Sequence, residues 1–277
     1  MKQTSLFFKI AILGLILMSC NHANKKADNT STTSGNDKVA AVQTKNTTAQ
    51  ILAKPQVPIL CYHQIVDGKK SEYAVSLSTF AAHIKILADS GYHSISPAQL
   101  YDYLVYNKTL PTKPVMITFD DSRAEHSEIA APTLEKYGFR GVFFIMTITY
   151  NKKNYMTTEQ IANLAKAGHT IGMHSWDHTM ATKYADSTDW KKQVVTPTLK
   201  LEKIVGKPVE YWAYPNGVNN HKAAEELNKH YKLSFILSTK RDSLLPLQTV
   251  RRMIVPEWSA QSLLKSMRKT FDKKEKI

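Results

Sequence analysis

Two short segments of the sequence carry side chains whose types and spacing suit metal-assisted hydrolysis. Asp120 and Asp121 are adjacent carboxylates, and His174 and His178 are imidazoles four residues apart. One carboxylate of such a pair can hold a divalent cation while the other stays free as a base. Two imidazoles with a carboxylate suit Zn²⁺ and similar ions. Plainer explanations exist for both segments: aspartate is common in turns after strands, and among ten histidines such a pair can arise by chance.

The elements that must position these residues follow an alternating order of strands and helices. Apolar runs predict strands at residues 57–62, 115–119, 141–146, 169–173, 209–214, 233–238 and 250–255. Helix starts are indicated between them, as at Ser96 before Pro97 and at Thr157 with Gln160. This order predicts a parallel α/β sheet, either open or closed into a barrel, and about 220 residues is enough for a barrel. Residues that follow parallel strands meet at one edge of the sheet, and both segments follow strands.

A third segment, YWAYPNG at residues 211–217, runs from a predicted strand into a turn. Proline, asparagine and glycine are ordinary turn residues, so the segment has a purely structural explanation. The functional alternative is that the turn aims a backbone N–H at a developing oxyanion.

In this order and at these separations, the TFDD, HSWDH and YPNG segments resemble the motifs of the polysaccharide deacetylase family. This is carbohydrate esterase family four, also called the NodB homology domain, and the likeness covers about residues 55–271. The resemblance implies a deformed, TIM-like (β/α) barrel of NodB type. It also implies hydrolysis of acetyl groups on a polysaccharide with the help of a divalent metal ion.

The same resemblance assigns roles to individual residues. Asp120 would be the catalytic base, and Asp121, His174 and His178 would hold the metal. The backbone N–H of Asn216 would help to hold the oxyanion. The metal would be Zn²⁺, with Co²⁺, Ni²⁺ and Fe²⁺ as alternatives that this ligand set also tolerates.

Two features depart from the common family pattern. Ala213 stands where many members carry an arginine that orients the base, so that task falls to another residue, such as Arg251 or Arg252. The C-terminal Leu-x-x-His motif, which supplies a general acid, is not evident. However, Tyr62 and His63 resemble a segment of the poly-N-acetylglucosamine deacetylase subgroup, which implies that His63 is the general acid. The alternative is a histidine held by structural hydrogen bonds.

Other aromatic and histidine residues carry weaker signals. Trp176 and Tyr214 are candidates for stacking on a sugar ring, and packing in the core is the alternative for both. His126 follows the aspartate pair and is expected on a helix surface.

The N-terminal residues predict export and lipidation. Residues 1–20 combine positive charge with a short apolar run, which is typical of a secretion signal. The run ends in Leu-Met-Ser-Cys, which resembles a bacterial lipobox with Cys20 as the lipidated residue. This implies a membrane-anchored lipoprotein of the cell envelope, in the periplasm or at the cell surface; an ordinary signal peptide is the alternative. Residues 21–54 are expected to be a disordered linker, and 55–277 the deacetylase domain.

Composition narrows the partners. Thirty-seven lysines and arginines against 23 acidic residues give a formal net charge of +14, which favours anionic surroundings. Export makes a cytoplasmic nucleic-acid binder an unsuitable interpretation, so no nucleic-acid partner is expected. Two cysteines exclude a disulfide-rich scaffold. We expect a monomer that contacts a membrane through its lipid.

The predicted activity is removal of N-acetyl groups from an N-acetylglucosamine polysaccharide of the envelope or biofilm. Resemblance at residues 62–63 favours poly-β-1,6-N-acetylglucosamine as substrate. Peptidoglycan N-acetylglucosamine and an O-acetylated glycan are the alternatives. A non-catalytic glycan-binding lipoprotein with the same fold is the alternative of a different class.

Overall fold

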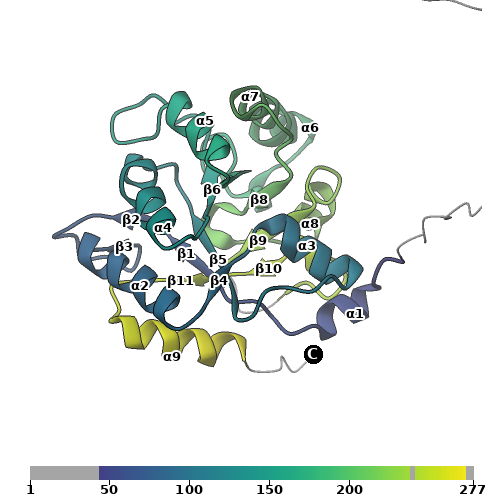
Figure 1. Cartoon of the computed structure of the whole chain (residues 1–277). Coiled ribbons are helices and arrows are strands. Elements are labelled where there is room, and N and C mark those ends of the chain that lie inside the picture. The colour runs from purple at the N-terminus through teal and green to yellow at the C-terminus, as the bar shows by residue number, and fades with distance from the viewer. Residues whose placement is uncertain (1–43, 238–240, 273–277) are drawn as a thin grey trace, which may run out of the picture. The chain divides into compact units, whose positions relative to one another are not determined.

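The computed structural model describes residues 44–237 and 241–272, which fold around one parallel sheet (Figure 1). Its strands follow the order β10-β9-β8-β7-β6-β5-β1-β11, and β4 pairs with β5. The strands are β1 Ile59–Tyr62, β4 His93–Ser94, β5 Pro114–Phe119, β6 Val142–Ile145, β7 Thr170–Met173, β8 Tyr211–Ala213, β9 Leu233–Ile236, β10 Val250–Arg251 and β11 Met253–Ile254. Two short strands, β2 Gln64–Ile65 and β3 Ala74–Val75, form a separate pair. A strand lies within each of the seven predicted ranges, although residue 238 is outside the described residues.

The two ends of the sheet are consecutive pieces of chain, so the sheet curls into a nearly closed barrel. Strand β10 pairs with β9, whereas β11, two residues further on, pairs with β1. Arg252 lies between them, and its N–H donates to the carbonyl of Ile236 at 3.1 Å. The N–H of Val255 donates to the carbonyl of Cys61 at 3.0 Å. The predicted deformed (β/α) barrel is therefore confirmed, and the single strand expected at 250–255 is split at Arg252.

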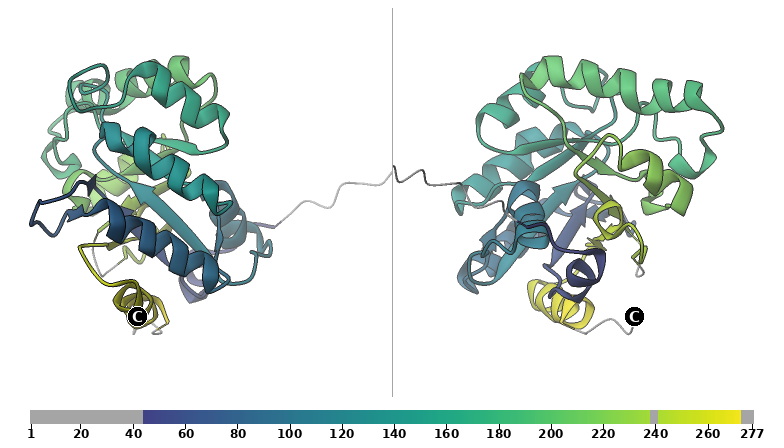
Figure 2. Two further views of the ribbon diagram at one scale, coloured as in Figure 1. Left: turned by 60° about the vertical axis from the view of Figure 1, so that its left-hand side comes forward. Right: turned by 90° about the vertical axis from the view of Figure 1, so that its right-hand side faces the viewer.

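Helices surround the sheet (Figures 1 and 2). They are α1 Thr48–Ala53, α2 Leu77–Asp89, α3 Pro97–Tyr106, α4 Ala131–Lys136, α5 Thr158–Lys166, α6 Ser187–Trp190, α7 Thr196–Val205, α8 His221–Leu227 and α9 Ala260–Phe271. The predicted capping residues are confirmed: the side chains of Ser96 and Thr157 accept from the N–H groups of Gln99 and Gln160. Such caps satisfy N–H groups that have no partner within the helix.

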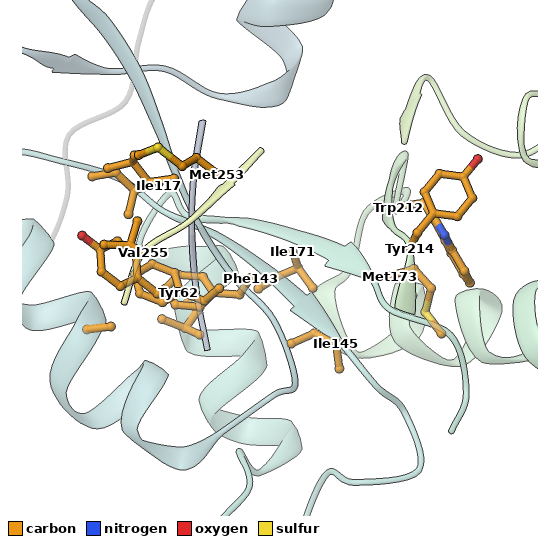
Figure 3. Packing of buried hydrophobic residues seen from close by; sticks show 14 of the residues in the cluster. Tyr62, Ile117, Phe143, Ile145, Ile171, Met173, Trp212, Tyr214, Met253 and Val255 are labelled. Carbon is orange, nitrogen blue, oxygen red and sulfur yellow. The ribbon is translucent and has the colours of Figure 1, made fainter. Parts of the chain in front are cut away.

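The buried side chains form two clusters on opposite faces of the strands. One face carries Ile59, Met116, Phe144, Ala213 and Phe235. Their chain neighbours Leu60, Ile117, Phe143, Trp212 and Ile236 belong to the other face, together with side chains from α2, α4, α5, α7 and α9. Because successive side chains of a strand point to opposite faces, the first set fills the barrel interior and the second packs under the outer helices. Figure 3 shows part of the outer cluster, including Trp212 and Tyr214.

The barrel interior leaves no room for a side chain at one position of β7. A Cβ atom at Gly172 would lie 2.5 Å from the ring of Phe144, so glycine is required there. The Phe144 ring in turn lies 5.4 Å from the ring of Phe235, centroid to centroid. These tightly packed side chains form a rigid base inside the barrel. The polar residues that follow the same strands lie beyond it, at the carboxyl ends.

The folded region begins earlier than the sequence predicted. Helix α1 starts at a capping box in which Thr47 and Gln50 exchange hydrogen bonds. Its Ile51 is buried in the interior cluster, and the Asn46 side chain donates to the carbonyl of Leu104 at 2.7 Å. The prediction that the linker extends to residue 54 is therefore wrong: one buried side chain and local caps are enough to dock this segment. Cys20 and residues 21–43 lie outside the described residues.

No helix within residues 44–237 and 241–272 is both long enough and apolar enough to cross a bilayer.

His169 gives the fold a dependence on pH. Its Nδ1 accepts the N–H of Gly141 at 2.9 Å, and its Nε2 lies 3.0 Å from the carboxylate of Glu135. The side chain is buried, and burial lowers the pKa of His169 below its ordinary 6.5 in spite of Glu135. Burial also lowers the pKa of His126. Folded histidines of this kind bind protons less readily than the same residues in the unfolded chain.

We predict that the free energy of unfolding falls as the pH drops below 6.5. Above that pH the imidazoles are neutral in both states and their contribution is complete; below it, the unfolded chain gains protons first. Urea denaturation at about pH 7.5 and about pH 5.5 measures the difference. His169→Ala should cost about 1–3 kcal/mol at the higher pH, because Gly141 loses its acceptor, and should reduce the pH-dependent loss. An equal pH-dependent loss in both proteins would contradict the assignment.

Candidate active site

The side chains that could take part in catalysis or metal binding lie at the carboxyl ends of the barrel strands. His63 follows β1, Asp120 and Asp121 follow β5, and His174 follows β7. The N–H of Asp120 donates to the carbonyl of Tyr62, and the N–H of His174 donates to the carbonyl of Ile145. These bonds extend the parallel ladders beyond the strands proper. The structure therefore brings together the first two segments that the sequence analysis singled out.

Asp121, His174 and His178 form one group of possible metal ligands. The Nε2 atoms of His174 and His178 lie 3.5 Å and 3.4 Å from Oδ1 of Asp121. The two imidazole rings meet edge to face, with their centroids 5.0 Å apart. One carboxylate oxygen and two imidazole nitrogens thus converge on a single point, as a divalent ion requires.

The backbone around this group is held in an uncommon conformation. Asp121, Ser122, Ser175 and His178 all have positive φ, between 57° and 75°. Non-glycine residues adopt this region only where the surroundings enforce it. Here the hydroxyl of Ser175 accepts the N–H of His178 at 2.8 Å, and the hydroxyl of Ser122 accepts the N–H of Met146 at 2.7 Å. The two serines therefore fix the turns that aim Asp121 and His178 inward.

The residues present fit a divalent cation. Nδ1 of His174 lies 2.8 Å from the carbonyl of Ala213, which can only accept, so Nδ1 carries the proton and Nε2 presents its lone pair. Oδ1 of Asp121 is buried and accepts no hydrogen bond within the part of the chain that the structure describes. A buried carboxylate oxygen without a partner is costly, and a cation between it and the imidazoles would remove that cost.

Asp120 is held quite differently, by Arg252. The NH1 and NH2 groups of Arg252 donate to the two oxygens of Asp120, each at 2.7 Å, in a two-pronged ion pair. Both residues are buried, at 1% and 3% exposure. Arg252 also donates to the hydroxyl of Thr118, which donates onward to the carbonyl of Leu60. Arg252, one of the two residues suggested to replace the arginine missing at Ala213, is therefore the one that contacts Asp120.

The charge of Asp120 is fixed by this pairing. Burial alone would raise the pKa of Asp120, but the Arg252 guanidinium outweighs it, and the pKa lies well below its ordinary value. The thiol of Cys61 donates to Oδ2 of the same carboxylate at 3.5 Å, and burial raises the pKa of that thiol well above its usual range. Cys61, His63 and Asp120 also lie close enough to form a ligand group. Because Arg252 occupies both oxygens of Asp120, the Asp121 group suits a cation better.

His63 also lies near the Asp120 carboxylate. Its Nε2 lies 3.9 Å from Oδ2 of Asp120, and its ring packs edge to face on Tyr73, 5.1 Å between centroids. Nε2 of His126 donates to the carbonyl of His63. Burial lowers the pKa of His63 in spite of the two neighbouring carboxylates. The prediction that His126 lies on a helix surface is wrong: its side chain is fully buried and supports the backbone at His63.

The remaining predicted residues lie at the edges of this site or away from it. Trp176, between the two histidine ligands, is half-buried and lines a cavity. The prediction that Tyr214 stacks on a sugar ring is wrong. Its side chain is completely buried in the outer cluster, so neither face of the ring is open to a ligand. Figure 3 shows Tyr214 among its neighbours in this cluster. Asn216 is exposed and lies between the buried residues Pro215 and Gly217 in the turn after β8, with φ of 58°. The role of its N–H as an oxyanion donor stays a prediction.

A parallel barrel with an aspartate and two histidines at its carboxyl edge, beside a second and separately held aspartate, is an arrangement suited to hydrolysis. Comparison with known proteins agrees. Residues 107–232 match the family model described as polysaccharide deacetylase. Over 123 residues the chain is 35% identical to YxkH of Bacillus subtilis, which is named among the polysaccharide deacetylases. Over 125 residues it is 26% identical to the peptidoglycan-N-acetylglucosamine deacetylase PgdA of Listeria monocytogenes.

These matches cover less than half of either relative: 43% of YxkH and 25% of PgdA, and 44% and 43% of this chain. Solved structures extend the likeness to most of the fold. The Streptococcus pyogenes deacetylase PplD, in complex with acetate, superposes with a TM-score of 0.71 at 24% identity, covering 77% of this chain and 99% of that one. IcaB from Ammonifex degensii gives 0.63 at 27% identity, covering 78% and 98%. Residues 107–232 therefore match a polysaccharide deacetylase domain, and the fold around them is that of the NodB type.

We predict that the buried pair of Asp120 and Arg252 is strongly coupled. Arg252→Met should lower the free energy of unfolding by about 3–5 kcal/mol, because it leaves the Asp120 carboxylate buried without its partner. The double variant Asp120→Asn/Arg252→Met should lose clearly less than the two single variants together. Urea denaturation of the three variants and the parent measures this coupling. Losses that simply add would show that the pair is not coupled.

We predict that Zn²⁺ binding depends on Asp121, His174 and His178. Replacing any one by Ala should sharply reduce the zinc retained after dialysis, since each supplies one of three converging ligand atoms. Elemental analysis of the purified variants measures it. Asp177→Asn is the matched control: Asp177 lies in the same loop, but its carboxylate accepts from Thr179. Zinc content that falls equally in this control, or in none of the variants, would contradict the ligand assignment.

Proposed function

We propose that this protein is a metal-dependent hydrolase that removes N-acetyl groups from an N-acetylglucosamine polysaccharide of the cell envelope. The observation that carries the proposal is the contrast between two adjacent carboxylates. Asp120 has both oxygens paired with Arg252, whereas Asp121 turns an unpartnered oxygen toward two imidazoles. The same residue type is thus set up for two different tasks within one turn.

The chain's own residues divide the hydrolysis as follows. A divalent ion held by Asp121, His174 and His178 would supply Lewis-acid activation of the acetyl carbonyl and of the attacking water. Asp120, ionised beside Arg252, accepts the proton that the attacking water gives up. The backbone N–H of Asn216 donates to the oxyanion that forms on the acetyl group.

His63 completes the reaction by giving a proton to the departing amine, which must leave neutral. Its Nε2 lies 3.9 Å from Oδ2 of Asp120, close to the proposed base, and this position supports the role. Burial lowers the pKa of His63, so its protonated form is a stronger acid toward the amine than an exposed imidazolium would be. The carbon–nitrogen bond breaks, and the products are acetate and a glucosamine unit.

Resemblance ranks the candidate substrates. The Tyr62-His63 segment favours poly-β-1,6-N-acetylglucosamine through its resemblance to that subgroup. The similarity to PgdA supports the peptidoglycan alternative. An O-acetylated glycan is the third candidate. We further propose that lipidated Cys20 holds the domain at a membrane of the envelope; acyl chain incorporation at that residue tests it.

We predict that the zinc-loaded protein releases acetate from N-acetylglucosamine oligomers and that Asp120→Asn loses this activity by about 10²–10⁴-fold while retaining zinc. Enzymatic determination of acetate, run beside elemental analysis, measures both. Glycan binding without acetate release would identify the non-catalytic alternative. Full turnover in Asp120→Asn would refute the base assignment.

His63→Ala is the companion variant in the same assay. Amide cleavage needs protonation of a poor leaving group, whereas an ester leaving group needs less help. The variant should therefore lose activity on N-acetyl substrates and keep much more on an O-acetyl ester. Equal losses on both would contradict the general-acid role of His63.

A further inference from the structure

Cys61 places a thiol beside both groups that move protons in the proposed reaction. Its Sγ lies 3.5 Å from Oδ2 of Asp120 and 3.9 Å from Nδ1 of His63. The cysteine is free, and its side chain is completely buried. The hydrolysis proposed above gives this thiol no task, although it contacts the proposed base directly.

The backbone of Cys61 is held from both sides. It belongs to β1, where it is paired with Thr118 of β5 and with Ile254 of β11. Its carbonyl accepts the N–H of Val255 at 3.0 Å. The freedom that remains to the side chain is rotation about its Cα–Cβ bond, which has a few staggered positions. The sulfur therefore has a well-defined place, from which it can hold a neighbouring group.

The thiol of Cys61 suits a hydrogen-bond donor better than a metal ligand. Burial raises the pKa of Cys61 well above its usual range, whereas a metal would need the thiolate. A protonated thiol donates one weak hydrogen bond, and its sulfur can accept another. The carboxylate of Asp120 can only accept, so the S–H points toward Oδ2. The sulfur is then left to accept from Nδ1 of His63.

We propose that Cys61 is a positioning residue of the active site: its S–H holds the carboxylate of Asp120, and its sulfur holds the imidazole of His63. The inference rests on the proposed function, in which these two groups are the base and the acid. Arg252 already pairs with both oxygens of the carboxylate. The thiol adds the link between base and acid. An ionised carboxylate accepts about four hydrogen bonds, so Arg252 and the thiol leave room for the attacking water.

Packing is the competing explanation, because a free cysteine also behaves as a small apolar side chain. Ile59 offers a matched control. It lies two residues earlier in β1, so it shares a face of the strand with Cys61, and it is buried in the interior cluster. Ile59→Val removes one carbon atom, as Cys61→Ala removes one sulfur atom, but it removes no hydrogen bond.

Infrared spectroscopy observes the S–H bond directly and needs no turnover. The chain has two cysteines, so a Cys20→Ser protein carries a single thiol. Donation to a carboxylate weakens the S–H bond, and its stretching band should lie at a lower frequency than that of an unbonded thiol. In Asp120→Asn the acceptor is neutral, and the band should move back toward the unbonded frequency. A band at the unbonded frequency in both proteins would overturn the proposal.

Acetate release by the zinc-loaded variants measures the consequence for catalysis. Cys61→Ala should lower kcat by about three- to tenfold and leave KM and the zinc content unchanged, because it disturbs the alignment of the proton-transferring groups. Cys61→Ser keeps a donor and should recover part of this loss, and Ile59→Val should keep the kcat of the parent. Equal losses in Cys61→Ala and Ile59→Val, or a fall in the zinc content of Cys61→Ala, would overturn the proposal.

The two measurements separate this inference from the proposed function. A shifted S–H band in a protein that releases no acetate from any N-acetylglucosamine substrate would overturn the proposed function and leave the thiol–carboxylate bond standing. Acetate release by the parent together with an unshifted band, or with full kcat in Cys61→Ala, would overturn the role of Cys61 and leave the proposed function standing.

Discussion

The buried ion pair between Asp120 and Arg252 is the interaction on which the rest of the site depends. A carboxylate in the interior of a barrel would ordinarily take up a proton, because burial penalises its charge. The two-pronged contact with Arg252 reverses that tendency, and Thr118 and the carbonyl of Leu60 hold the guanidinium in place. The pair keeps Asp120 ionised and occupied, whereas Oδ1 of the adjacent Asp121 accepts no hydrogen bond among the described residues.

The same arginine lies where the barrel closes. β10 and β11 pair with opposite ends of the sheet, and Arg252 is the residue between them. Strand pairing on both sides fixes its backbone, so its side chain reaches Asp120 from a rigid support rather than from a loop. The closure of the barrel therefore supplies the group that sets the charge of Asp120.

The loop after β7 holds two residues in an uncommon backbone conformation, and hydrogen bonds stabilise it there. Positive φ at Ser175 and His178 turns the second histidine toward Asp121, and the Ser175 hydroxyl satisfies the backbone of His178. On its other side the loop is hydrogen-bonded to the carbonyl that Pro197 leaves free. The loop that carries His174 and His178 is thus joined by a backbone hydrogen bond to the helical segment before Pro197.

The sequence by itself was sufficient for the positions of the strands along the chain and for most helix starts, and a family resemblance supplied the three candidate metal ligands. These rest on local rules: apolar periodicity, capping residues, and the fact that residues after parallel strands meet at one edge. It narrowed the partner of Asp120 to Arg251 or Arg252 and could not choose, because alternating neighbours on a strand face opposite sides and the strand is broken there. The burial of Tyr214 and His126 and the docking of α1 were decided only by tertiary packing. Each depends on contacts between segments far apart in the chain, which no local pattern records.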